Sequence, residues 1–160
     1  MKLNKIIKLV SITLVGVTLT GTLAGCSDDD SDSSTEVSSQ SHKKKLTKKQ
    51  RINKMVKSEQ KVYGKKANVA YSKKLNAITV TPTSQAFTAE VTELLDHTSN
   101  ESSDWKDLTN AFKDLSITVH DKTQIKDISV VLLNPNNTKN ALYIARDGET
   151  LYDLAKDQNR

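Results

Sequence analysis

Histidine and acidic side chains are the residues of this chain that could support catalysis or bind a metal. The histidines are His42, His97 and His120. None of them has a cysteine or a second histidine at the spacing of a metal-ligand pair. His97 and His120 are expected near the C-terminal ends of helices, where the helix dipole favours a protonated imidazole. The sequence therefore favours structural positions for these histidines, with a catalytic or ligand role for either as the alternative.

Carboxylates also occur in patterns that could do chemistry. Glu90 and Glu93 stand three residues apart on an expected helix, and paired carboxylates can divide the roles of acid and base. Two solvated acids on an exposed helix face explain the spacing more simply. The run from Asp28 to Asp32 lacks the glycine and the distal glutamate of a calcium loop. No nucleophile-elbow or glycine-rich phosphate loop is present either. We therefore predict a protein that is not an enzyme and has no cofactor or metal site.

The N-terminal segment has the layout of an export signal. Lys2, Lys5 and Lys8 precede an apolar stretch over residues 9–23, which closes on Leu23-Ala24-Gly25-Cys26. This tetrapeptide resembles the lipobox of bacterial lipoproteins, in which a diacylglyceryl group is added to the cysteine sulfur and a dedicated peptidase cuts just before that residue. The resemblance implies that residues 1–25 are a lipoprotein signal peptide. It also implies that Cys26 is the lipidated first residue of the mature protein, on the extracytoplasmic face of the cell membrane.

Three other interpretations of this segment are weaker. A transmembrane helix needs about 20 apolar residues, and this stretch is shorter and carries several serines and threonines. An ordinary secretory signal would end in a small-residue A-x-A cleavage site, which is missing. A structural disulfide is excluded within the chain, because Cys26 is the single cysteine and has no second thiol to pair with. Two acyl chains on Cys26 would give a stable membrane anchor.

Charge is separated along the rest of the chain. Residues 26–45 are rich in serine and aspartate and are predicted to form a lipidated, disordered tether, with a root-mean-square span of roughly 25 Å. Residues 43–74 then hold thirteen basic side chains and one acid, Glu59, whereas residues 75–160 hold eight basic and thirteen acidic ones. Such blocks indicate an oriented surface rather than a uniformly solvated one.

The basic residues gather where the tether meets the domain. Anionic lipid would attract such a group with roughly 1 kcal/mol per residue, and the phosphates of a wall polymer could do the same. Because residues 43–61 include no aromatic side chain, we do not expect a nucleic-acid partner. The alternative is a helix face that is simply solvated. The residues predicted to contact an anionic surface are Lys43, Lys44, Lys45, Lys48, Lys49 and Arg51.

Residues 46–160 are predicted to form a single α+β domain. Thr47 and Gln50 make a capping box for a helix that ends at Gly64, and apolar spacing predicts further helices over about 84–97 and from about 104 onward. Strands are expected at 69–71, 78–80, 128–132, 142–144 and 151–152, with Asp147-Gly148 as a type I′ turn. The predicted order is α-β-β-α-α-β-β-β, a mostly antiparallel five-stranded sheet covered on one face by three helices.

The domain is similar to small uncharacterised lipoproteins of lactobacilli and related Gram-positive bacteria. The residues that carry this similarity are Trp105, Leu133-Asn134-Pro135, and the Asp147-Gly148 hairpin that leads to Tyr152-Asp153. The similarity spans about residues 46–157 and implies no activity. Trp105 itself is expected in the core, with a ligand pocket as the alternative.

The sequence as a whole predicts a membrane-anchored, non-enzymatic interaction module of the cell envelope. The membrane would be contacted through the lipid, and the partner would be an anionic lipid, a wall polymer or an envelope protein. One alternative is a small envelope hydrolase, which would need His97 or His120 beside a carboxylate within a cleft. The other is a solute-binding lipoprotein of a transporter, for which residues 46–160 are a short domain.

Overall fold

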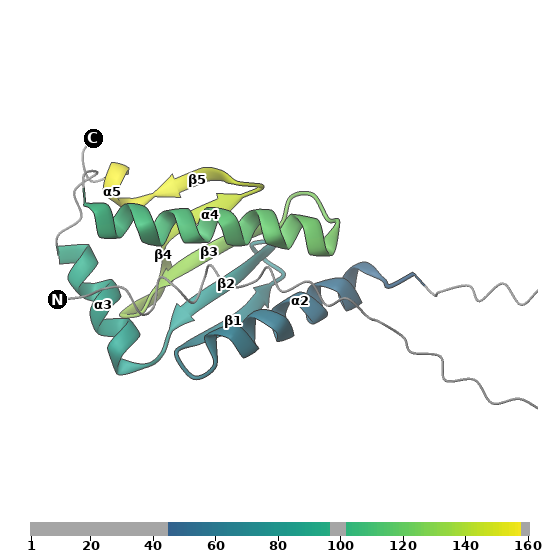
Figure 1. The fold of residues 1–160 in the computed structure, drawn as a ribbon, viewed down its shortest axis with the longest axis horizontal. Helices are drawn as coiled ribbons and strands as arrows, with labels where there is room; N and C mark the ends of the chain where they lie inside the picture. Colours follow the sequence, from purple (N-terminus) through teal and green to yellow (C-terminus); the bar gives the residue numbers. More distant parts are fainter. Residues whose placement is uncertain (1–44, 97–101, 158–160) are drawn as a thin grey trace, which may run out of the picture.

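The computed structural model describes residues 45–96 and 102–157. Their elements are α2 (Lys48–Tyr63), β1 (Ala67–Ser72), β2 (Ala77–Pro82), α3 (Gln85–Asp96), α4 (Ser103–Thr123), β3 (Ser129–Asn134), β4 (Asn137–Arg146), β5 (Glu149–Asp153) and α5 (Leu154–Asp157) (Figure 1). The predicted signal peptide, the lipidation of Cys26 and most of the tether lie outside the described residues. So do His42, His97, Lys43 and Lys44.

The five strands form one sheet in the order β1-β2-β3-β4-β5. Neighbouring strands are antiparallel except for β2 and β3, which are parallel. The predicted α+β class, the five strands and the mostly antiparallel pairing are confirmed, and the β2–β3 pair makes the sheet a mixed one. The parallel pair arises because the chain returns through α3 and α4 before it enters β3, and a helical crossover of this length permits parallel pairing. A fourth short helix, α5, follows the predicted elements.

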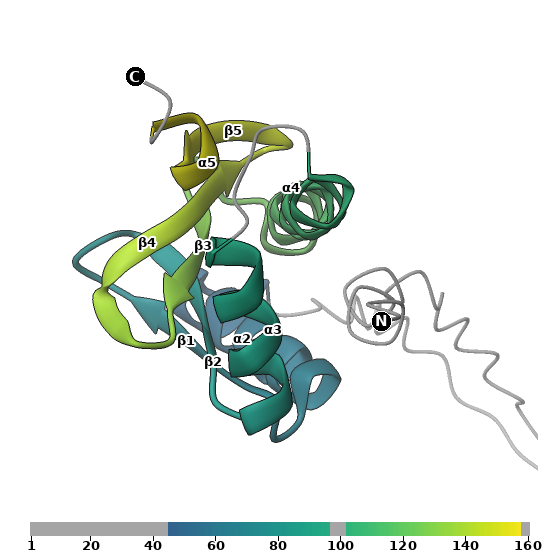
Figure 2. The same ribbon diagram turned by 90° about the vertical axis from the view of Figure 1, so that its left-hand side faces the viewer.

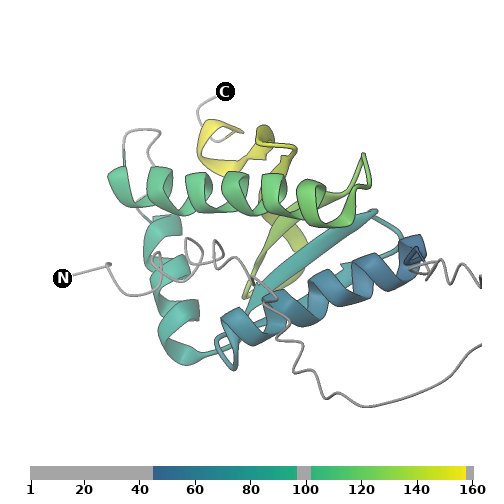
Figure 3. The same cartoon turned by 45° about the vertical axis from the view of Figure 1, so that its right-hand side comes forward.

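The helices lie on one side of the sheet, as predicted (Figure 2 and Figure 3). Between the two layers lies a core in which Ile78, Val80, Val130 and Leu132 of the central strands are fully buried. The core includes Trp105, which is 2% exposed and meets its predicted role as a core residue. No helix among the described residues is long and apolar enough to span a bilayer.

Local signals in the sequence define the ends of the elements. The Thr47 side chain accepts from the Gln50 N–H at 3.3 Å while the Thr47 N–H donates to Gln50 Oε1 at 2.9 Å, which confirms the capping box of α2. The helix ends at Gly64, whose φ is +58°. The β4–β5 turn has φ of +52° at Asp147 and +83° at Gly148. Positive φ at both central residues is the signature of the predicted type I′ turn.

The interior contains one acidic side chain of α2. Glu59 is 2% exposed, and its Oε1 has no hydrogen-bond partner among the described residues. Burial raises the pKa of this carboxyl above its ordinary value of 4.5, and the charge of Lys122 on α4 offsets part of that increase. The folded protein therefore holds the Glu59 proton more tightly than a solvated glutamate does.

Replacing Glu59 by glutamine should stabilise the domain at neutral pH. The folded state holds the Glu59 proton more tightly than the unfolded state does. The free energy of unfolding therefore falls as pH rises above 4.5, until the raised pKa is passed. Each unit of increase in pKa corresponds to about 1.4 kcal/mol. Urea denaturation at pH 4.5 and pH 7 measures the free energy of unfolding of both proteins. The decrease caused by Glu59 between these two pH values should be absent from Glu59→Gln.

The exposed Glu93 of α3 provides the control for that measurement. Glu93→Gln should change the free energy of unfolding by less than about 0.5 kcal/mol at either pH. If Glu59→Gln instead destabilised the protein at pH 7, the ionised carboxylate would be the favoured form in the fold, and its attraction to Lys122 would outweigh its burial.

Candidate functional site

The histidine that the structure describes, His120, does meet a carboxylate. His120 Nδ1 lies 2.9 Å from Asp147 Oδ1, within ion-pair distance but without the alignment of a hydrogen bond. Nearby, the Gly148 N–H donates to Ser116 Oγ at 2.9 Å, and that hydroxyl donates to the Lys113 carbonyl at 2.7 Å. Ser116 is completely buried. Serine, histidine and aspartate are thus close together, but in this arrangement they fasten the β4–β5 turn to α4, and the hydroxyl is inaccessible to a substrate.

The other acidic candidates are separated by their surroundings. Glu90 of α3 is half-buried, whereas Glu93 is exposed. Burial is the main cause that raises the pKa of Glu90, with Lys66 lowering it and Glu93 raising it further. Within the described ranges, no three histidine, cysteine or acidic residues are placed to hold a metal ion. The two glutamates lie on one helix, as predicted, but Glu90 is half-buried, so the interpretation of two solvated acids holds only for Glu93.

The side of the sheet opposite the helices is apolar and hollow. Along the central strands, Ala77, Thr79 and Val131 point away from the helical core, since the residues between them line that core. Val131 is 3% exposed, and Ile144 beside it in β4 is half-buried. The hollow measures about 840 Å³. We call it the open sheet face, and its lining residues are Ser72, Lys74, Leu75, Ala77, Thr79, Ser129, Val131, Leu133, Thr138, Lys139, Ala141, Ile144 and Leu151.

The rim of the open sheet face combines aliphatic and cationic groups. Leu75 in the β1–β2 turn is 56% exposed, and Leu151 on β5 is 47% exposed. Lys74 and Lys139 are exposed on the same rim, and none of the described residues that line the hollow is acidic. A ligand that fits this surface would bring aliphatic groups to the centre and negative charge to the edge.

The sequence held a signal for this face that alternation alone misses. Val130, Val131, Leu132 and Leu133 form a continuous apolar run, and such runs are typical of strands that are covered on both faces. Alternation along the predicted strand 128–132 identifies Ile128, Val130 and Leu132 as one buried stripe and gives no role to the residues between them. The structure covers one face of that strand with helices and leaves the other face uncovered by any described element (Figure 2).

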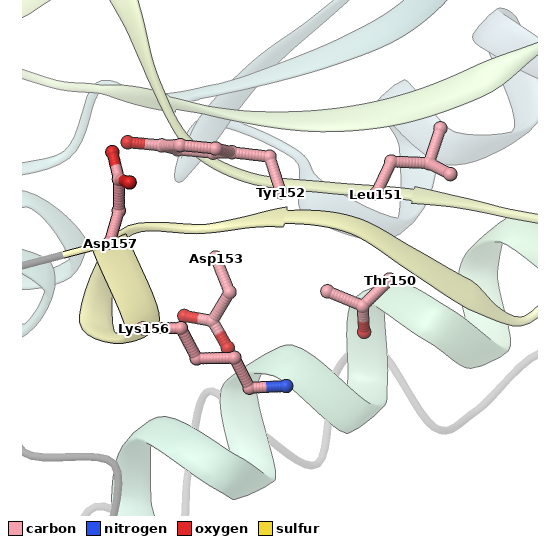
Figure 4. Close-up of a pocket in the computed structure, with 6 residues that line it drawn as sticks. All are labelled: Thr150, Leu151, Tyr152, Asp153, Lys156 and Asp157. Carbon is pink, nitrogen blue, oxygen red and sulfur yellow. The ribbon is translucent and has the colours of Figure 1, made fainter. Parts of the chain in front are cut away.

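A smaller hollow of about 230 Å³ lies at β5 and α5. Figure 4 shows Leu151 and Tyr152 on one side of β5 and Thr150 and Asp153 on the other, toward α4. Asp153 Oδ1 accepts the Trp105 Nε1–H at 2.9 Å and the Ala155 N–H at 3.1 Å, so this carboxylate serves the fold.

Tyr152 is a titratable side chain on the side of β5 that faces away from α4 (Figure 4). Burial, followed by the carboxylates of Asp157 and Asp153, raises the pKa of its hydroxyl. The phenol therefore stays protonated at neutral pH. Because Tyr152 pairs with Ile144 in the register, it extends the open sheet face toward the C-terminus.

A third hollow, of about 570 Å³, involves the predicted basic junction. We call it the basic cleft, and its lining residues are Lys48, Lys49, Ile52, Asn53, Tyr71 and Lys73. Of the predicted surface residues, Lys48 and Lys49 belong to it. Arg51 is half-buried on α2 and Lys45 is exposed ahead of the helix, and neither lines the cleft. The structure adds an aromatic ring from β1 that the local sequence around the lysines lacks.

Comparison with known proteins gives no direct guide to this chain. No protein-family model matches it, and neither the curated proteins nor the solved structures provide a match. The similarity to small Gram-positive lipoproteins therefore stays a prediction from the residues that carry it. The functional argument depends on the surfaces described above and on the N-terminal motif.

Proposed function

We propose that this protein is a lipid-anchored, extracytoplasmic binding module that holds a protein partner on its open sheet face. The observation that carries this proposal is the hollow, apolar second face of the sheet. Single-chain proteins rarely expose a large contiguous apolar patch unless it is an interaction site. Leu75, Ile144 and Leu151, which keep accessible apolar surface in the free domain, would gain about 25 cal/mol for each Å² that a partner buries.

The chemistry of the rim indicates what the partner presents. Lys74 and Lys139 flank an aliphatic centre, and its lining includes no acid from residues 45–96 or 102–157. A polypeptide segment with aliphatic side chains and flanking carboxylates is complementary to it, since rim charges guide association and orientation. The proposal therefore names an acidic and aliphatic segment of an envelope protein as the ligand.

The anchor would determine where this partner is met. With Cys26 acylated, the tether up to Lys45 would hold the domain roughly 25 Å from the bilayer on average. Partners would then be membrane proteins or proteins close to the membrane. The tether also raises the effective concentration of such partners relative to a freely diffusing domain.

Aspartate at the rim of the open sheet face should abolish partner capture. In cells that produce the anchored chain, a short amine-reactive crosslinker would link Lys74 or Lys139 to the bound partner. We expect the adduct of the Leu75→Asp/Leu151→Asp variant to fall at least about tenfold, because two buried aliphatic contacts are replaced by charge. Both leucines are exposed in the free domain, so its free energy of unfolding should change by less than about 0.5 kcal/mol per site.

Leu46→Asp is the matched control for that experiment. Leu46 is 45% exposed and lies ahead of α2, away from the open sheet face. Its replacement should leave the adduct unchanged. Equal adduct from all variants would contradict binding through this face, and an adduct of twice the chain mass would replace the envelope partner with a second copy of the protein.

A further inference from the structure

We propose that the basic cleft binds the phosphodiester headgroup of an anionic phospholipid in the membrane that holds the anchor. This inference adds a second contact to the proposed function and relies on the acylation of Cys26 only for its location. The cleft has two walls from distant parts of the chain. The first two turns of α2 supply Lys48, Lys49, Ile52 and Asn53, and the end of β1 with the turn after it supplies Tyr71 and Lys73.

The β1 wall of the cleft is fixed in position. The Tyr71 hydroxyl donates to Asn76 Oδ1 at 2.7 Å, and Asn76 Nδ2 donates to the Asp127 carbonyl at 2.7 Å. Tyr71 also packs against the hydrophobic core. The ring therefore stands at a defined place beside α2, which lies alongside β1 and β2 (Figure 3). A preorganised wall reduces the ordering cost of binding.

The charge of the cleft is uncompensated among the described residues. Three ammonium groups line it and no carboxylate does. The first turn of α2 has no acidic residue, and the ion pairs found in the described ranges involve other side chains. Lysine ammonium groups act as compact point charges toward phosphate oxygens, and the Asn53 amide can donate as well. The site therefore selects an anion with several acceptor oxygens.

The floor of the cleft selects a particular kind of anion. Ile52 lines the cleft and is 4% exposed, and the Tyr71 ring and lysine stems add apolar surface beside it. A phosphate that is esterified to a glycerol and its acyl chains offers an apolar body below a charged group. An inorganic or polymer phosphate has no such body. Lys48 follows Cys26 by 22 residues, and a coil of that length spans roughly 25 Å, so the anchored cleft can reach the bilayer surface.

The test measures partition of the unacylated chain into lipid vesicles. The chain from residue 26 onward with Cys26→Ser keeps the whole core, whose residues lie between Ile52 and Ala155. Vesicles of phosphatidylglycerol with phosphatidylcholine should bind it, and vesicles of phosphatidylcholine alone should not. Lys48→Glu/Lys49→Glu/Lys73→Glu should weaken binding about 100-fold, since each basic residue at a membrane surface contributes about fivefold.

The control variant reverses the same number of lysine charges at positions outside the basic cleft. Lys57, Lys61 and Lys65 are exposed and do not line the cleft. Replacing these three by glutamate should weaken binding only a few-fold. Equal loss in the two triple variants would show attraction by net charge alone and would overturn the cleft as a site.

Two further outcomes separate the lipid from other sources of phosphate. Soluble polyglycerol phosphate should compete only weakly, because it offers nothing to the apolar floor. If it bound as tightly as the vesicles at equal phosphate concentration, a wall polymer would be the ligand and the lipid proposal would be wrong. No binding to any anionic vesicle would also overturn it. Because the chain carries no acyl group, neither result would affect the proposed anchor.

Discussion

Replacing Trp105 by alanine should lower the free energy of unfolding by about 3–5 kcal/mol, the range for removing a large aromatic side chain from a core. Trp105 lies in the first turn of α4 and is 2% exposed. Its indole N–H also donates to Asp153 Oδ1 at 2.9 Å, which ties α4 to the junction of β5 and α5. Since small domains have a total stability of about 5–15 kcal/mol, this one change should leave the fold marginal.

The measurement is urea denaturation of the unacylated chain followed by circular dichroism. Fluorescence is unsuitable because Trp105 is the single tryptophan. Trp105→Phe separates the two contributions, because it keeps most of the packing and removes the hydrogen bond. We expect it to cost about 1–2 kcal/mol, the order expected for losing one hydrogen bond to the half-buried Asp153 carboxylate. A loss below about 1 kcal/mol for Trp105→Ala would contradict the packing described here.

Replacing Cys26 by serine should remove acylation and processing. The lipobox implies that the diacylglyceryl group is attached through the cysteine sulfur, and a serine hydroxyl provides no such attachment. Each buried methylene of an acyl chain contributes about 0.8 kcal/mol to membrane affinity, so losing two chains removes a stable anchor. In a bacterial host, incorporation of labelled fatty acid should fall to background, and intact mass should show residues 1–25 retained.

Ser27→Ala provides the matched control, since it alters the neighbouring residue and leaves the sulfur in place. It should be labelled and processed like the original chain. Retention of the label in Cys26→Ser, or a mature chain that begins elsewhere than residue 26, would contradict the lipoprotein interpretation. Fractionation alone would not discriminate, because a retained apolar segment can also hold the chain at the membrane.

Local structure was the part of the fold that the sequence predicted best. The capping box at Thr47, the stop at Gly64 and the turn at Asp147 each depend on a few neighbouring residues, and each was confirmed. The end of α4 does not follow from local preference, because Ile117, Thr118 and Val119 favour strands. Val119 is fully buried, and tertiary packing holds this run in the helix.

Features of the fold that depend on residues far apart in the sequence could not be predicted from local sequence patterns. The parallel pairing of β2 with β3 depends on how α3 and α4 carry the chain between them. The basic cleft joins Lys48 and Lys49 to Tyr71 and Lys73, which come together only because α2 packs along β1. The short α5 is too brief for a periodic pattern, and it begins where Asp153 accepts the Ala155 N–H.

The most direct test of the proposed function places a photoactivated crosslinking residue at single positions of the anchored chain. Leu151 on the open sheet face and Lys106 on α4, both exposed, are the positions to compare. In intact cells, we expect Leu151 to give one discrete adduct with an envelope protein and Lys106 to give none. Adducts from Lys106 alone, or equal adducts from both positions, would contradict the account that this protein binds its partner through the open sheet face.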